Sequence, residues 1–116
     1  MSKREWKLFI KDILESIELI EKYVENMKFD EFIKDRKTID AVVRNFLIIG
    51  EASKNIPDNI KNNYPDVDWK GIAGFRNRVV HAYFEISTHI VWYIIKNELP
   101  LLKNQMKQIL EKESKL

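Results

Sequence analysis

Residues 6–27 read WKLFIKDILESIELIEKYVENM, with apolar side chains at alternating intervals of four and three residues. The repeating positions are Trp6, Ile10, Ile13, Ile17, Ile20, Val24 and Met27. This interval predicts one long helix whose apolar side packs against near-parallel neighbouring helices. Lysine and glutamate residues occupy the opposite side, which we expect to face solvent.

The same spacing returns in a second helix, which the sequence predicts to begin after Asp35. Its apolar positions are Ile39, Val42, Phe46 and Ile49. Pro57 limits this helix at about Asn55. Gly50 lies within the pattern, where glycine costs about 1 kcal/mol relative to alanine. We therefore expect another backbone segment to approach Gly50 closely.

The rest of the chain continues the helical pattern after a loop predicted at residues 57–68. Asp68 is a suitable N-cap for a third helix from Trp69 to near Phe84. The apolar positions of that helix are Ile72, Phe75, Val79 and Ala82. A fourth helix is predicted to begin at Ser87 or Thr88.

Pro100 is expected to kink or restart this fourth helix. Its apolar positions are Ile90, Val91, Ile94, Ile95, Leu102, Met106 and Ile109. With no alternating strand pattern, no repeat and no long linker, the sequence predicts one domain, residues 1–116. The expected fold is all-α, an antiparallel four-helix up-and-down bundle with a split last helix.

Composition excludes several classes of protein. The chain of 116 residues has no cysteine, which excludes disulfides, thiolate metal sites and a cysteine nucleophile, and fits a cytoplasmic location. Its longest apolar run, residues 90–95, is far shorter than the ~20 residues that span a bilayer. The formal net charge of +2 is too small to indicate nucleic-acid binding by itself.

The residues suited to chemistry are concentrated in residues 69–84, WKGIAGFRNRVVHAYF. This segment carries Lys70, Arg76, Arg78 and His81 but no carboxylate. A cationic stretch with aromatic residues between its charges suits a phosphodiester. No histidine pair has metal-ligand spacing and no glycine-rich phosphate loop is present, so we expect neither a metal nor a cofactor.

Helical spacing places several of these side chains near each other. Asn77 precedes His81 by four residues, so its amide can orient the imidazole, and Arg78 precedes His81 by three. Tyr83 follows Arg76 by seven residues and returns to nearly the same side. A structural alternative also remains, in which the arginines pair with surface carboxylates and His81 stabilises the helix C-terminus.

The pattern of Arg76, four residues, His81, one residue and Tyr83, with Asn77 after the arginine, resembles the signature of HepT-like proteins. These belong to the HEPN superfamily of small helical ribonucleases and their relatives. The resemblance extends over nearly the whole chain. Its further landmarks are Gly50-Glu51-Ala52, Tyr64-Pro65, Trp69, Val91-Trp92 and Leu99-Pro100.

This resemblance implies the toxin of a type VII-like toxin–antitoxin system, acting as a metal-independent endoribonuclease and a homodimer. It also implies a minimal nucleotidyltransferase antitoxin as partner, which adenylylates Tyr83. His81 would then be the general acid and base, because imidazole exchanges protons near neutral pH. Arg76 would stabilise the phosphorane through planar bidentate donors. Asn77, Arg78 and Lys70 would support RNA binding.

A second class of function remains open on the sequence. In that alternative the chain is a non-catalytic helical module that binds the nucleotidyltransferase, and its basic residues only hold phosphate. Trp69 and Trp92 are expected to be structural, and His89 to be a surface residue.

Overall fold

The structure, a computed structural model of residues 1–116, describes residues 5–84 and 88–114. Within these ranges it does not describe the side chains of Val80, Ala82, Tyr83, Phe84 and Ser114. The described residues form helices and no strand. The helices are α1 (Trp6–Tyr23), α2 (Phe29–Phe32), α3 (Arg36–Lys54), α4 (Asp58–Asn63), α5 (Trp69–Ala73), α6 (Phe75–Phe84), α7 (Thr88–Asn97) and α8 (Leu99–Ser114).

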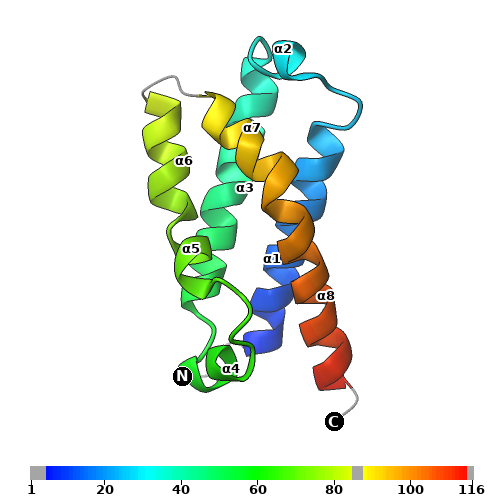
Figure 1. The fold of residues 1–116 in the computed structure, drawn as a ribbon, viewed down its shortest axis with the longest axis vertical. Helices are drawn as coiled ribbons and strands as arrows, with labels where there is room; N and C mark the ends of the chain where they lie inside the picture. The colour runs from blue at the N-terminus through cyan, green and yellow to red at the C-terminus, as the bar shows by residue number, and fades with distance from the viewer. Residues whose placement is uncertain (1–4, 85–87, 115–116) are drawn as a thin grey trace.

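The long helices run side by side in alternating directions. Figure 1 shows α1 rising, α3 descending, α5 and α6 rising together, and α7 and α8 descending together. Helix α1 packs against α3 and α8, and α6 packs against α3 and α7. The bundle measures 45 × 26 × 26 Å. This is the antiparallel all-α architecture with a split last helix that the sequence predicts.

Two aspartates begin helices as predicted. Asp35 Oδ1 accepts a hydrogen bond from the Thr38 backbone N–H at 3.0 Å at the start of α3. This hydrogen bond lowers the pKa of the Asp35 carboxyl group. Asp68 Oδ1 likewise accepts from the Gly71 N–H at 3.0 Å at the start of α5. Both carboxylates satisfy N–H groups that the first helical turn leaves without partners.

The apolar stripes of the long helices meet in one core. Ile90, which the sequence assigns to this core, is instead 36% exposed. The predicted core positions that the structure buries are Ile10, Ile13, Ile17, Ile20, Val24, Ile39, Val42, Phe46, Ile49, Ile72, Phe75, Val79, Val91, Ile94, Ile95, Leu102, Met106 and Ile109. Trp69 and Trp92 are partly buried against them, as expected.

Two local predictions about helix extent are wrong. The first helix ends at Tyr23 and does not continue to Met27, because the backbone reverses near Asn26, whose φ is 63°. Residues 57–68 are not wholly a loop, since α4 occupies Asp58–Asn63 directly after Pro57. Proline is well suited to the start of a helix, where its missing N–H costs nothing.

The predicted third helix is also interrupted, at Gly74. This residue ends α5 with φ −80° and ψ −6°, and α6 begins at Phe75. Glycine is the weakest helix former after proline, so its position allows the axis to change direction there. The break sets the direction of α6, the helix that carries Arg76 and His81.

Gly50 lies where the backbone of this break passes α3, as the sequence predicts. A Cβ atom added at Gly50 would lie 3.6 Å from the carbonyl oxygens of Ile72 and Ala73 and 3.7 Å from the Arg76 nitrogen. A methyl group would make ordinary contacts at these distances, but a larger side chain would push the backbone away. Gly50 therefore brings the first turn of α6 close to α3.

Candidate functional site

Helix α6 presents the predicted catalytic residues and is held by its apolar side. Phe75 and Val79 are buried against the core. The rings of Phe46 and Phe75 meet edge to face, with centroids 5.4 Å apart, and so join α3 to the first turn of α6. Arg76 follows Phe75 directly, so this contact orients the helix at the point where its polar side begins.

Arg76, Asn77 and His81 are all exposed on α6. At about 100° per residue, Asn77 and His81 are separated by roughly 40° around the helix axis, whereas Arg76 and His81 are separated by roughly 140°. No hydrogen bond joins Asn77 to His81 among the interactions of the described side chains. The structure thus brings Asn77 and His81 to one side of α6, whereas Arg76 lies on a different part of its exposed surface.

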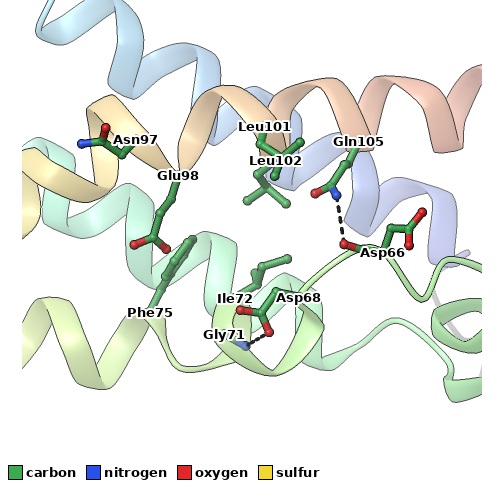
Figure 2. A pocket seen from close by; sticks show the side chains of 10 residues that line it. All are labelled: Asp66, Asp68, Gly71, Ile72, Phe75, Asn97, Glu98, Leu101, Leu102 and Gln105. Atoms are coloured by element: carbon green, nitrogen blue, oxygen red, sulfur yellow. Dashed lines mark hydrogen bonds between the residues drawn. The ribbon is translucent and has the colours of Figure 1, made fainter.

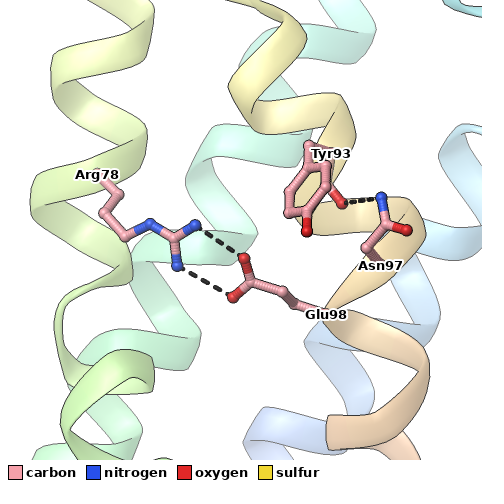
Figure 3. A network of polar contacts seen from close by, with 4 residues as sticks. All are labelled: Arg78, Tyr93, Asn97 and Glu98. Atoms are coloured by element: carbon pink, nitrogen blue, oxygen red, sulfur yellow. Dashed lines mark hydrogen bonds and ion pairs between the residues drawn. The ribbon is translucent and has the colours of Figure 1, made fainter.

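Arg78 differs from its neighbours because it is paired with a carboxylate. Its two terminal nitrogens donate to the two carboxylate oxygens of Glu98, at 3.0 and 2.8 Å (Figure 3). Donation to this carboxylate raises the pKa of the Arg78 guanidinium. The side chains are 41% and 34% exposed, so the pair lies at the surface. This matches, for Arg78, the structural alternative in which an arginine of this segment pairs with a surface carboxylate.

The other predicted site residues are more dispersed. Lys70 is exposed on α5, one helix before the others. Tyr83 belongs to α6, but its side chain is outside the described part of the structure. His89 is exposed in the first turn of α7, as expected for a surface residue.

A cavity of about 190 Å³ opens beside the Arg78–Glu98 pair, between α5 and the junction of α7 and α8. Figure 2 shows Phe75, Ile72 and Leu102 lining this cavity together with the carboxylates of Asp68 and Glu98. Carboxylates repel phosphate oxygens, so this cavity does not suit a phosphodiester. The exposed polar side of α6 is the better candidate for an RNA-binding surface.

No group of three or more histidine and acidic side chains in residues 5–84 and 88–114 could hold a metal ion. Within the same ranges, every helix is too short or too polar to cross a lipid bilayer.

The family model described as Ribonuclease HepT-like matches residues 13–109. The chain therefore belongs to the HepT-like ribonuclease family, which confirms the family resemblance of the Arg76 to Tyr83 segment. This family places it among the helical proteins of the HEPN superfamily.

Two relatives match the chain over most of their length. The chain is 44% identical to "Putative RNase MJ0127" from Methanocaldococcus jannaschii, over 96% of this chain and 89% of the relative. It is 40% identical to "Probable ribonuclease HepT" from Thermococcus cleftensis, over 92% of this chain and 97% of the relative. No solved structure gives a significant match to the chain.

Glu98 is the site-adjacent residue that the sequence did not single out. It lies 20 residues after Arg78, at the junction where α7 ends and α8 begins. The nearby Pro100 indicates that junction, but no spacing rule indicates which arginine the carboxylate would contact. Only the packing of α6 beside α7 brings the two charges together.

Proposed function

We propose that this protein is a metal-independent endoribonuclease and the toxin of a type VII-like toxin–antitoxin system. The observation that carries the proposal is the exposure of Arg76 and His81 on α6, a helix without carboxylates, in a chain of a ribonuclease family. Among the described residues, neither side chain is engaged in an ion pair. Both are therefore available to a bound phosphodiester.

The proposed reaction is an internal transfer on RNA. The His81 imidazole takes the proton of the 2′-hydroxyl, and the 2′-oxygen attacks the adjacent phosphorus. Arg76 stabilises the charge that develops on the nonbridging oxygens, because its planar guanidinium donates two hydrogen bonds at once. The bond to the 5′-oxygen breaks, and that oxygen receives a proton from an imidazolium. The products are a 2′,3′-cyclic phosphate and a 5′-hydroxyl.

A homodimer completes this proposal. Arg76 and His81 of one α6 diverge by roughly 140° around the helix, and each chain supplies one His81. A twofold-related copy would bring a second imidazole to the same cleft, so that one acts as base and the other as acid. Asn77 would orient His81, while Lys70 and Arg78 would contact the RNA backbone.

Purified wild-type protein is expected to cleave single-stranded RNA in the presence of excess chelator. The reason is that imidazole and guanidinium supply both proton transfer and charge stabilisation. Mass spectrometry of the products should find 2′,3′-cyclic phosphate or its opened form, and light scattering of the same sample should report a dimer.

Two outcomes would contradict this proposal. Activity that disappears with chelator and returns with a divalent cation would mean that a metal carries the reaction. RNA binding without any cleavage would favour the alternative, a non-catalytic module that binds the nucleotidyltransferase.

The proposed control is adenylylation of Tyr83 by a minimal nucleotidyltransferase antitoxin. Attached AMP adds bulk and a negative phosphodiester close in sequence to His81, and this phosphodiester can pair with Arg76 in place of RNA. We expect incubation with the antitoxin and ATP to add AMP to the Tyr83 peptide and to abolish RNA cleavage. Peptide mass spectrometry and a cleavage assay measure both effects.

Tyr83→Phe provides the matched control for this modification. It keeps the ring but lacks the hydroxyl acceptor, so the variant should stay unmodified and active after the same incubation. Adenylate found on another residue of wild-type protein, or full cleavage after modification, would contradict the proposed control.

A further inference from the structure

The Arg78–Glu98 ion pair connects α6, which carries the proposed catalytic residues, to the junction between α7 and α8. Glu98 is the single residue between α7 and α8. Its backbone N–H donates to the Ile94 carbonyl at 2.9 Å, and its carbonyl accepts from the Leu102 N–H at 3.2 Å. The carboxylate is therefore presented to Arg78 from a backbone that is held on both sides.

The guanidinium of Arg78 is oriented by this carboxylate in a way that also suits a phosphate. The two donors make parallel hydrogen bonds of 3.0 and 2.8 Å to two oxygens of one planar group. Two nonbridging oxygens of a phosphodiester offer an arginine the same pair of acceptors. In the free protein, the Glu98 carboxylate thus engages the two donors that Arg78 would offer to an RNA phosphate.

Exchange of one anion for the other is energetically feasible because the pair is at the surface. The two side chains are 41% and 34% exposed, so water already screens their attraction. Arg78 also precedes His81 by one helical turn, which places it beside the proposed reaction site. Figure 3 shows that the pair is approached from α7 by Tyr93, an aromatic side chain that is 56% exposed.

We infer that Glu98 is a positioning residue that holds Arg78 extended in the free protein and releases it to an RNA phosphate when RNA binds. The inference rests on the proposed function, because it requires RNA at the exposed side of α6. In this role Glu98 lowers the affinity of the protein for RNA and keeps the Arg78 guanidinium positioned to bind a phosphate.

The test uses a short, fluorescein-labelled, 2′-O-methylated single-stranded RNA of mixed sequence. This probe cannot be cleaved, because the 2′-oxygen that would attack is blocked, so fluorescence anisotropy measures binding alone. Glu98→Gln keeps the size of the side chain and removes its charge. We expect this variant to bind the probe roughly two- to fivefold more tightly, the range that corresponds to losing one exposed ion pair as a competitor. With unmodified RNA, the gain should appear in KM and not in kcat.

Arg78→Gln tests the other partner. If Arg78 contacts a phosphate in the complex, this variant should bind more weakly, and the slope of log Kd against log salt should fall by about 0.7 between about 50 and 200 mM salt. Adding Glu98→Gln to Arg78→Gln should bring no further gain, because no arginine remains to be released. Glu25→Gln, at an exposed acidic residue, is the control for the change in net charge.

Several outcomes overturn the inference. An unchanged salt slope in Arg78→Gln would mean that Arg78 never leaves Glu98. Weaker binding by Glu98→Gln, or an equal gain in Glu25→Gln, would mean that the carboxylate does not compete with RNA. If the wild-type protein cleaves unmodified RNA but the variants give one of these results, the exchange alone is disproved. Wild-type protein that binds the probe without cleaving RNA disproves the proposed catalysis alone, and protein that does neither disproves both.

Discussion

Replacing His81 with alanine is expected to slow RNA cleavage by about 10²- to 10⁴-fold, the usual contribution of a positioned general acid or base. The imidazole is exposed on α6 beside Asn77, so its removal leaves no core contact unfilled. The variant should therefore keep the wild-type unfolding temperature while losing activity. Single-turnover cleavage of a labelled RNA, with thermal unfolding of the same sample, measures both quantities.

The chain provides a matched control for this experiment in its other histidine. His89 is also exposed, in the first turn of α7, and takes no part in the proposed reaction. His89→Ala should cleave RNA at close to the wild-type rate. Arg76→Ala should lose a factor comparable to that of His81→Ala, through lost charge stabilisation in the transition state. Wild-type cleavage by purified His81→Ala protein would disprove the proposed mechanism.

Phe46→Ala is expected to lower the free energy of unfolding by about 3–5 kcal/mol, the typical cost of removing a buried phenylalanine ring. Phe46 is 0% exposed, and its edge-to-face contact with Phe75 joins α3 to α6. Loss of the ring leaves a cavity beside the residue that precedes Arg76. Urea denaturation measures the loss of stability, which corresponds to a fall in Tm on the order of 15 °C.

Leu101→Ala is the control for this destabilisation. Leu101 is 62% exposed, so its truncation should change stability by less than about 0.5 kcal/mol. A loss below about 1 kcal/mol in Phe46→Ala would contradict the tight packing of the two rings. We also expect RNA cleavage by Phe46→Ala to fall at temperatures at which the wild-type protein is still active, because α6 loses its support on α3.

Much of the fold could be predicted because its signals are local. The intervals of three and four residues in α1 depend only on the geometry of one helix, and the four isoleucines they select are buried while Trp6 is partly buried. Asp35 and Asp68 cap α3 and α5 because their acceptors bond to backbone three residues away. Glycine within a helical pattern likewise indicated a close approach, and Gly50 provides one.

The candidate site could be predicted in part, for a related reason. Arg76, Asn77 and His81 lie within six consecutive residues, so the geometry of one helix places Asn77 beside His81 and Arg76 roughly 140° from His81. Their exposure depends on which side of α6 the core covers, and the burial of Phe75 and Val79 agrees with the apolar spacing. Their catalytic roles remain predictions that the His81→Ala and Arg76→Ala experiments test.

Tertiary structure decided the features in which distant segments meet. The apolar spacing of the sequence continued through Gly74, but the helix is interrupted there, where the backbone passes close to Gly50 of α3. Glycine is a weak helix former, so Gly74 permits this interruption. The partner of Arg78 is 20 residues away and depends on how α6 lies beside α7. By itself, the sequence determined the helices, their caps and the residues that share each side. The packing of one helix on another decided which charge meets which, because such contacts depend on positions in space that no local interval encodes.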